Sequence, residues 1–340
     1  MRNLLCAIIV LLASAAPALA WHGKGHARVA RAAVAAVPEE MPPFFRHGTR
    51  QIVGTCNDPD LFTRPIAPAE LHDAEAPEHY FDIELLAKDT AAIKALRLPA
   101  TRYEYLQACF ERKLAANKIG LLPYAVTEYT ERLAVAMAEY RHDPNDAQVQ
   151  AKCLFYAGLL AHYGADLCQP LHTTIHYDGR VGADGASSRS GIHSKTDALI
   201  QKLPDDGDLL KGVAAKGLVD VRKMQLAPPA TGPATKPLTT STAARPKRPP
   251  SVLLEAVLGQ IKQSHALVDR VYELEKSLPA YEEPQIKDAA VRDFAADRVR
   301  TSAQFVASLY LTAWQMSEHI PLPEWYKREK AQAEESAKGK

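Results

Sequence analysis

Long apolar runs, alternating strand patterns and an excess of charge are absent from most of this sequence. Beyond residue 20, no stretch approaches the roughly 18 apolar residues of a membrane-spanning helix, so we expect no membrane insertion. Lysine and arginine total 41 against 40 aspartate and glutamate residues. This balance does not indicate a nucleic-acid-binding protein. It does not exclude one either, because bound metal ions would add positive charge that the count omits.

Strand-like alternation is missing, and apolar residues instead recur at three- and four-residue steps. We therefore predict an all-α, multi-helix single domain over residues 21–326, followed by a charged, frayed tail at 327–340. In one expected helix Asp146 is the N-cap, and Pro170 ends it near Gln169. The other helices are expected at residues 25–37, 123–141, 205–218 and 252–276, with one or two more over 286–319 and loops at 38–77 and 177–191.

Cysteine is scarce, with 5 residues in the chain, one of them inside the apolar amino-terminal segment. The other four are Cys56, Cys109, Cys153 and Cys168. In an exported protein they permit two disulfides with three possible pairings. Buried free thiols are the alternative, which Cys153 favours because it lies on an apolar helical stripe.

The first twenty residues have the pattern of a secretory signal peptide. Arg2 is basic, residues 4–12 are apolar, and Ala18-Leu19-Ala20 fits a small-x-small cleavage site. We expect cleavage before Trp21 and a secreted or periplasmic protein. Residues 226–251 are rich in proline and contain basic residues but no acid. We expect an exposed insertion there, most simply a solvated loop, with a membrane or nucleic-acid patch as the alternative.

Two histidine–aspartate pairs indicate a metal site. His162 and Asp166 are four residues apart on a predicted helix and share one face. His172 follows just past the helix end, and His193 and Asp197 repeat the four-residue spacing. Imidazole nitrogens and carboxylate oxygens are ligands that zinc takes. One such pair would usually face solvent, but two pairs together favour a metal cluster.

Other candidate ligands lie upstream. A free amine and carbonyl at a processed Trp21 could chelate a metal, and His26 follows closely. Segments expected to be loops contain further candidates, Asp58 with Asp60 and Glu78 with His79. In the same region, His72 and Asp73 are competing candidates for metal ligands.

In this order the motifs resemble the trinuclear-zinc single-strand nucleases of fungi and plants, the S-one/P-one type, which are related to bacterial zinc-dependent phospholipase C. The likeness covers nearly the whole chain after residue 20, and its most specific piece runs from Asp166 to His172. Pro59 and Thr196 stand where the family usually carries tryptophan. The resemblance implies three zinc ions per chain, held by Trp21, His26, Asp60, His79, His162, Asp166, His172, His193 and Asp197.

The resemblance also implies how the ligands divide. One zinc takes Asp60, His79, His162 and Asp166. A neighbour takes the amine and carbonyl of Trp21 with His26 and shares Asp166, and a third takes His172, His193 and Asp197. The implied activity is phosphodiester hydrolysis by a zinc-bridging hydroxide, leaving 5′-phosphates and also removing 3′-phosphates. Asp60 and Asp166 are the implied catalytic residues.

Substrate contacts are implied for Tyr80, Asp82 and Arg64. Tyr80 would stack on a base, Asp82 would contact the base edge, and Arg64 would hold phosphate. A packed Tyr80 and a helix-capping Asp82 are the alternatives. The expected protein is a monomeric endonuclease for single-stranded DNA and RNA. A phospholipase C and an inactive exported zinc-binding protein are the rival functions.

Overall fold

A computed structural model describes residues 21–205, 207–224 and 251–327 of the chain. Within these ranges there is no strand, only one isolated bridge between Val181 and Ser187, so the predicted all-α fold class is confirmed. The α-helices are α1 (His22–Ala35), α2 (Pro43–His47), α3 (Thr49–Thr55), α4 (Asp58–Phe62), α5 (Ala69–Glu75), α6 (Thr90–Ala95), α7 (Arg102–Glu111), α8 (Ala116–Ile119), α9 (Leu122–His142), α10 (Ala147–Asp166), α11 (Ile192–Asp197), α12 (Val252–His265), α13 (Val268–Leu274) and α14 (Ala289–Ser317). Short 3₁₀ helices are η1 (Ala76–His79), η2 (Ile83–Leu85), η3 (Pro170–Thr173), η4 (Ile200–Lys202), η5 (Gly207–Leu210), η6 (Val221–Lys223) and η7 (Glu275–Ser277).

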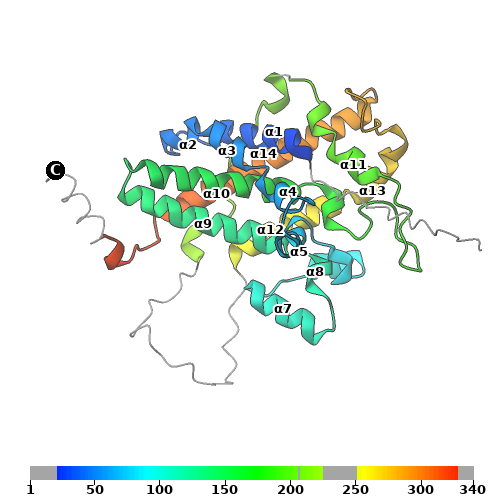
Figure 1. Cartoon of the computed structure of the whole chain (residues 1–340), viewed down its shortest axis with the longest axis horizontal. Coiled ribbons are helices and arrows are strands. Elements are labelled where there is room, and N and C mark those ends of the chain that lie inside the picture. The colour runs from blue at the N-terminus through cyan, green and yellow to red at the C-terminus, as the bar shows by residue number, and fades with distance from the viewer. Residues whose placement is uncertain (1–20, 206, 225–250, 328–340) are drawn as a thin grey trace, which may run out of the picture.

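The three longest helices, α9, α10 and α14, pack on one another and form the centre of the molecule. Helix α1 lies against α10 and α14, and α3 covers another side of α10 (Figure 1). In the described part of the chain, no helix is both long enough and apolar enough to cross a membrane.

Helix α10 is buried on every side along its second half, from Ala157 to Asp166. Its start follows the sequence, because the Asp146 carboxylate accepts hydrogen bonds from the backbone N–H groups of Gln148 and Val149, as an N-cap does. Gly158 allows the close approach of α3, since a Cβ there would lie 1.8 Å from Thr55 Oγ1. A fully buried helix end carrying His162 and Asp166 places polar ligands inside the core.

Three expectations about elements were wrong. The segment 38–77 is not a loop but contains α2 to α5, of which α2 and α4 carry proline in the first turn, where proline costs no hydrogen bond. Residues 205–218 form only the single turn η5 within their described part. Residues 252–276 divide into α12, α13 and η7, with a break at Ala266 and Leu267. Over 286–319, where one or two helices are expected, the structure has one continuous helix, α14.

The disulfide expectation is not met. Cys56, Cys109, Cys153 and Cys168 are all free and buried. They belong to different parts of the fold, on or beside α3, α7 and α10, and the Cys56 thiol donates instead to the carbonyl of Val53. Burial raises the pKa of the Cys56, Cys153 and Cys168 thiols to about 12. The alternative of buried free thiols is therefore what the structure shows.

The expected signal peptide, the greater part of the proline-rich insertion and all but the first residue of the tail lie outside the described residues. Ser251 is described and is the N-cap of α12, where its hydroxyl accepts from the backbone of Leu254.

Candidate metal centre

Ligand candidates from four separate elements meet beside the buried end of α10. Helix α10 provides His162 and Asp166, α1 provides His26 one turn from its start, α4 provides Asp60, and η1 provides His79. All five side chains are buried. Asp58, the neighbouring acid on α4, is not among them.

Asp166 is the meeting point of this first cluster. Its Oδ1 lies 3.3 Å from His26 Nε2, and its Oδ2 lies 3.1 Å from His79 Nδ1 and 3.4 Å from His162 Nε2. Asp60 Oδ1 is 4.0 Å from His162 Nε2. Ligand atoms of His79, His162 and Asp166 lie within 4.8 Å of one another, and so do those of His26, Asp60 and His162. The cluster could therefore hold metal ions through two overlapping sets of ligands.

A second cluster consists of His172 on η3 with His193 and Asp197 on α11. Asp197 Oδ2 is 3.3 Å from His193 Nε2, and Asp197 Oδ1 is 4.0 Å from His172 Nε2. Atoms of all three residues lie within 4.8 Å of one another. The helical spacing of four residues brings His193 and Asp197 together, as the sequence predicts.

Hydrogen bonds at the rear of the ligands fix their orientation. His162 Nδ1 donates to the carbonyl of Cys56, and His172 Nδ1 donates to the carbonyl of His79, both at 2.8 Å. In each ring the Nε2 atom is thereby left facing its cluster. Gln169 Nε2 donates to Asp197 Oδ1 at 2.6 Å. Such outer hydrogen bonds are typical of metal-binding histidines and carboxylates.

The residues fit a cation because several buried polar atoms face one another without hydrogen bonds. Among the described residues, no hydrogen-bond partner exists for Asp166 Oδ1, Asp197 Oδ2, His172 Nε2 or His193 Nε2. Leaving such atoms unpaired is costly in a protein core. A cation among them would satisfy imidazole nitrogens and carboxylate oxygens together.

Burial shifts the pKa values of these ligands in the direction that disfavours charge. It raises the pKa of Asp166 to about 7 and that of Asp60 to about 6. It lowers the pKa of His193 to about 3 and the pKa values of His162 and His172 well below their ordinary range. His162, His172 and His193 are thus neutral, as metal ligands must be, at ordinary pH. Burial also acts to lower the pKa of His79, but the hydrogen bond to Asp166 and the charges of Asp166, Asp60 and Glu75 outweigh it, so the pKa of His79 is raised.

Trp21 stands directly before α1 and is fully buried. Its indole Nε1 donates to the carbonyl of Ala165 at 2.9 Å, which fastens the residue next to Asp166. Its expected role as an amine ligand stays a prediction.

The three residues implied in substrate binding lie near the clusters but are less buried. Arg64 follows α4 and lies close to Asp60. Burial raises the pKa of Asp60, and the positive charge of Arg64 partly opposes this rise. Tyr80 is half-buried, its hydroxyl donates to the carbonyl of Asn117, and burial raises its pKa to about 12. Asp82 directly precedes η2, but its side chain makes no capping hydrogen bond there, which argues against the helix-capping alternative. Burial raises the pKa of Asp82 to about 8.

Other sequence candidates do not join the clusters. His72 and Asp73 contact each other at 3.2 Å on the outer side of α5 and are largely exposed. Two residues that the sequence did not single out do approach the first cluster, namely Glu75 on α5 and Tyr163 on α10. The position of Glu75 one helical turn before His79 was the only available signal.

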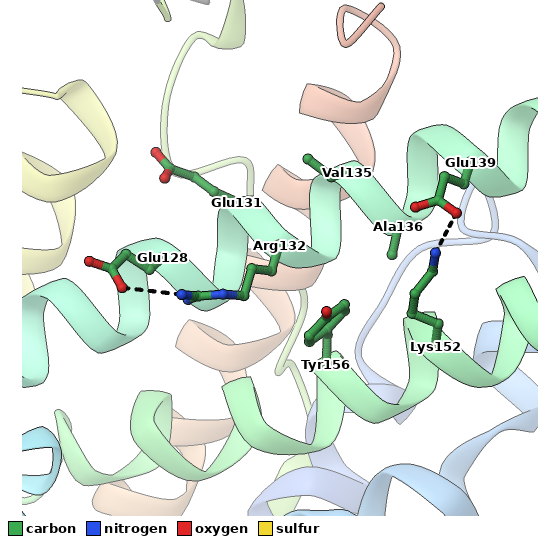
Figure 2. Close-up of a pocket in the computed structure, with 8 residues that line it drawn as sticks. All are labelled: Glu128, Glu131, Arg132, Val135, Ala136, Glu139, Lys152 and Tyr156. Atoms are coloured by element: carbon green, nitrogen blue, oxygen red, sulfur yellow. Dashed lines mark hydrogen bonds and ion pairs between the residues drawn. The ribbon is translucent and has the colours of Figure 1, made fainter. Parts of the chain in front are cut away.

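A groove of about 400 Å³ lies elsewhere, between α9 and α10 (Figure 2). Two of its three carboxylates face cations of the same groove, Glu128 beside Arg132 and Glu139 beside Lys152. None of the histidines or aspartates of the two clusters lines it. We assign it no part in the metal centre.

No protein-family model, curated protein or solved structure matches the chain. The fold class and the two clusters are therefore what the structure contributes, and the activity is a proposal.

Proposed function

We propose that this protein is an exported zinc-dependent phosphodiesterase that cleaves single-stranded DNA and RNA to products with 5′-phosphates, and also removes 3′-phosphates. The observation that carries the proposal is the arrangement of the ligand residues. Eight buried side chains fall into a larger cluster around Asp166 and a separate cluster around Asp197. This division agrees with the one that the nuclease resemblance implies.

In such a site, bound zinc would supply two things: a water of lowered pKa that can act as the nucleophile, and positive charge that stabilises the phosphoryl oxygens. The residues of the chain would do the rest. His26, Asp60, His79, His162 and Asp166 would hold a pair of ions, and His172, His193 and Asp197 would hold a third. Asp166 would serve both members of the pair, because its two oxygens face different histidines. Asp60 would also orient the attacking water.

The proposed contacts with the substrate involve Tyr80, Asp82 and Arg64. Arg64 would bind a phosphate oxygen, and the half-buried ring of Tyr80 would stack on a base. Stacking one base on an aromatic ring contributes about 1–3 kcal/mol without selecting a sequence. A stacking side chain of this kind would favour single strands, whose bases are free to stack.

The experiment compares single-stranded nucleic acid with a phosphatidylcholine emulsion, using purified protein processed to Trp21 and loaded with zinc. We expect nucleic acid to be cleaved and the lipid to be left intact. Tyr80→Ala should slow cleavage of the nucleic acid by roughly ten- to a hundredfold and leave a base-free chromogenic phosphodiester nearly unaffected. Cleavage of phosphatidylcholine alone would replace the proposal with a phospholipase C. No cleavage of either substrate by zinc-loaded protein would favour a zinc-binding protein without catalysis.

A further inference from the structure

The proposed metal ligands of the first cluster give no role to one nitrogen, His79 Nε2. His79 Nδ1 faces the cluster, 3.1 Å from both Asp166 Oδ2 and His162 Nε2. His79 Nε2 points away, is buried, and has no hydrogen-bond partner in the described part of the chain. A neutral imidazole that binds a cation through one nitrogen carries its proton on the other. His79 Nε2 would then be a buried donor that needs an acceptor.

The carboxylate that faces this nitrogen belongs to Glu75, the last residue of α5. Glu75 Oε1 lies 3.9 Å from His79 Nε2, and the Glu75 side chain is only 15% exposed. The nearby Glu78 is occupied, because it pairs with Arg102. A movement of about 1 Å would bring Glu75 into hydrogen-bond range of the imidazole.

Tyr163 holds Glu75 in this position. The Tyr163 hydroxyl donates to Glu75 Oε1, the same oxygen that faces His79. Tyr163 is 1% exposed, and it follows the ligand His162 directly on α10. Its ring stacks on the Tyr129 ring, with centroids 5.3 Å apart, and the Arg132 guanidinium lies over the Tyr129 ring. The hydroxyl therefore belongs to a buried, well-packed side chain.

We propose that Glu75 is a positioning residue of the metal centre, which accepts the Nε2–H hydrogen bond of His79 and is itself oriented by the Tyr163 hydroxyl. The other histidines with a hydrogen bond behind the ring, His162 and His172, use neutral backbone carbonyls. An anionic acceptor makes the imidazole a stronger ligand than a carbonyl does. His79 would thus be the most tightly oriented and most basic of the three. The proposal rests on the proposed function only in requiring that the cluster binds a divalent cation.

The test measures zinc affinity by chelator competition on the full processed chain, with Glu75→Gln, Tyr163→Phe and Glu70→Gln. Glu70 is the matched control, since it is an exposed carboxylate on the same short helix. We expect Glu75→Gln to weaken zinc binding at the first cluster about 10- to 100-fold, the range for loss of such partners. Tyr163→Phe should weaken it less, and Glu70→Gln should have no effect. Affinity at the Asp197 cluster should be unchanged in all three.

A second readout separates positioning from general support of the fold. Cobalt substituted for zinc reports ligand geometry by its visible absorption, and Glu75→Gln and Tyr163→Phe should shift that band, whereas Glu70→Gln should not. Wild-type zinc affinity and an unchanged cobalt spectrum in Glu75→Gln and Tyr163→Phe would overturn the proposal. If Glu75→Gln does not fold, the Tyr163→Phe result decides alone. Zinc binding that depends on Glu75 in a protein without phosphodiesterase activity would uphold this inference and refute the proposed function.

Discussion

Among single residues, Asp166 has the greatest influence on the centre. Its two oxygens contact three histidines from three different elements, and the residue is fully buried. Asp197 has the corresponding place in the second cluster but contacts fewer ligands. Changes at the two aspartates should therefore have unequal consequences.

The first prediction compares Asp166→Asn with His193→Ala. Asp166→Asn should lower the zinc content by about two ions per chain, because in the proposed centre its charge would serve both ions of the pair. His193→Ala should lower it by about one. Elemental analysis of purified protein measures both. Equal losses from the two variants would contradict the shared role of Asp166.

The second prediction concerns pH. Zinc binds the deprotonated ligands, so its affinity should rise with pH until the carboxylates of Asp60 and Asp166 are ionised, at about 6 and about 7 in the metal-free protein. Below about pH 6, zinc binding should release protons from these two carboxylates, and their contribution should diminish as the pH rises above about 7. Calorimetry in buffers of different ionisation enthalpy measures the release.

His162, His172 and His193 should contribute little to this proton release, whereas His79, whose pKa the nearby carboxylates raise despite its burial, should contribute to it. Burial lowers the pKa of His193 to about 3 and holds those of His162 and His172 well below their ordinary value. Nitrogen NMR of metal-free protein at pH 5.5 should therefore show these imidazoles neutral. Charged imidazoles at that pH would assign the acid sensitivity to histidine, as its ordinary pKa of about 6.5 would lead one to expect.

At the scale of elements, the contact between α3 and α10 places Cys56 behind His162. The Cys56 carbonyl accepts from His162 Nδ1, and Cys56 directly follows α3. Gly158 makes the contact possible, because a Cβ there would lie 1.8 Å from Thr55 Oγ1 and 2.8 Å from the carbonyl oxygen of Ile52. The orientation of a ligand on α10 thus depends on a glycine one turn earlier.

The third prediction is that Gly158→Ala destabilises the protein by about 1–3 kcal/mol, as overpacking of a tight helix contact does. Gly259→Ala on α12 is the control, because nothing lies within 4 Å of its added Cβ. The control should stabilise the protein by about 0.5–1 kcal/mol, as alanine does in a helix interior. Denaturant unfolding measures both. Effects of the same sign would mean that the α3–α10 contact is looser than described.

For the whole molecule, the two clusters link segments that are far apart in the chain. Ligands come from α1, α4, η1, α10, η3 and α11, and the His79 backbone joins the clusters by accepting from His172 Nδ1. Phe81 N–H donates to the His172 carbonyl in return, at 2.8 Å. Metal ions in these clusters would therefore act as cross-links through the centre of the fold.

The fourth prediction is that chelation of zinc lowers the melting temperature by roughly 5–10 °C, the scale of a few kcal/mol of ligand stabilisation in a domain of this size. Adding zinc back should restore it, whereas magnesium should not, since magnesium prefers oxygen ligands. Differential scanning calorimetry measures the change. An unchanged melting temperature on verified removal of zinc would exclude a cross-linking role.

The sequence alone determined the parts of the site that depend on local geometry. A spacing of four residues puts His162 with Asp166, and His193 with Asp197, on one face of a helix wherever those helices lie. The Asp146 cap and the apolar periodicity likewise fixed the start of α10, because both act within a few residues. The all-α class follows from the same local patterns.

Only the tertiary structure decided what depends on packing between distant segments. Helices α2 to α5 are five to seven residues long and too short to be stable alone, so contacts with the rest of the fold stabilise them, and local periodicity does not reveal them. The separation of the four thiols and the burial that shifts the carboxylate pKa values arise in the same way. Each depends on which surfaces pack together in three dimensions, and the spacing of residues along the chain does not encode that packing.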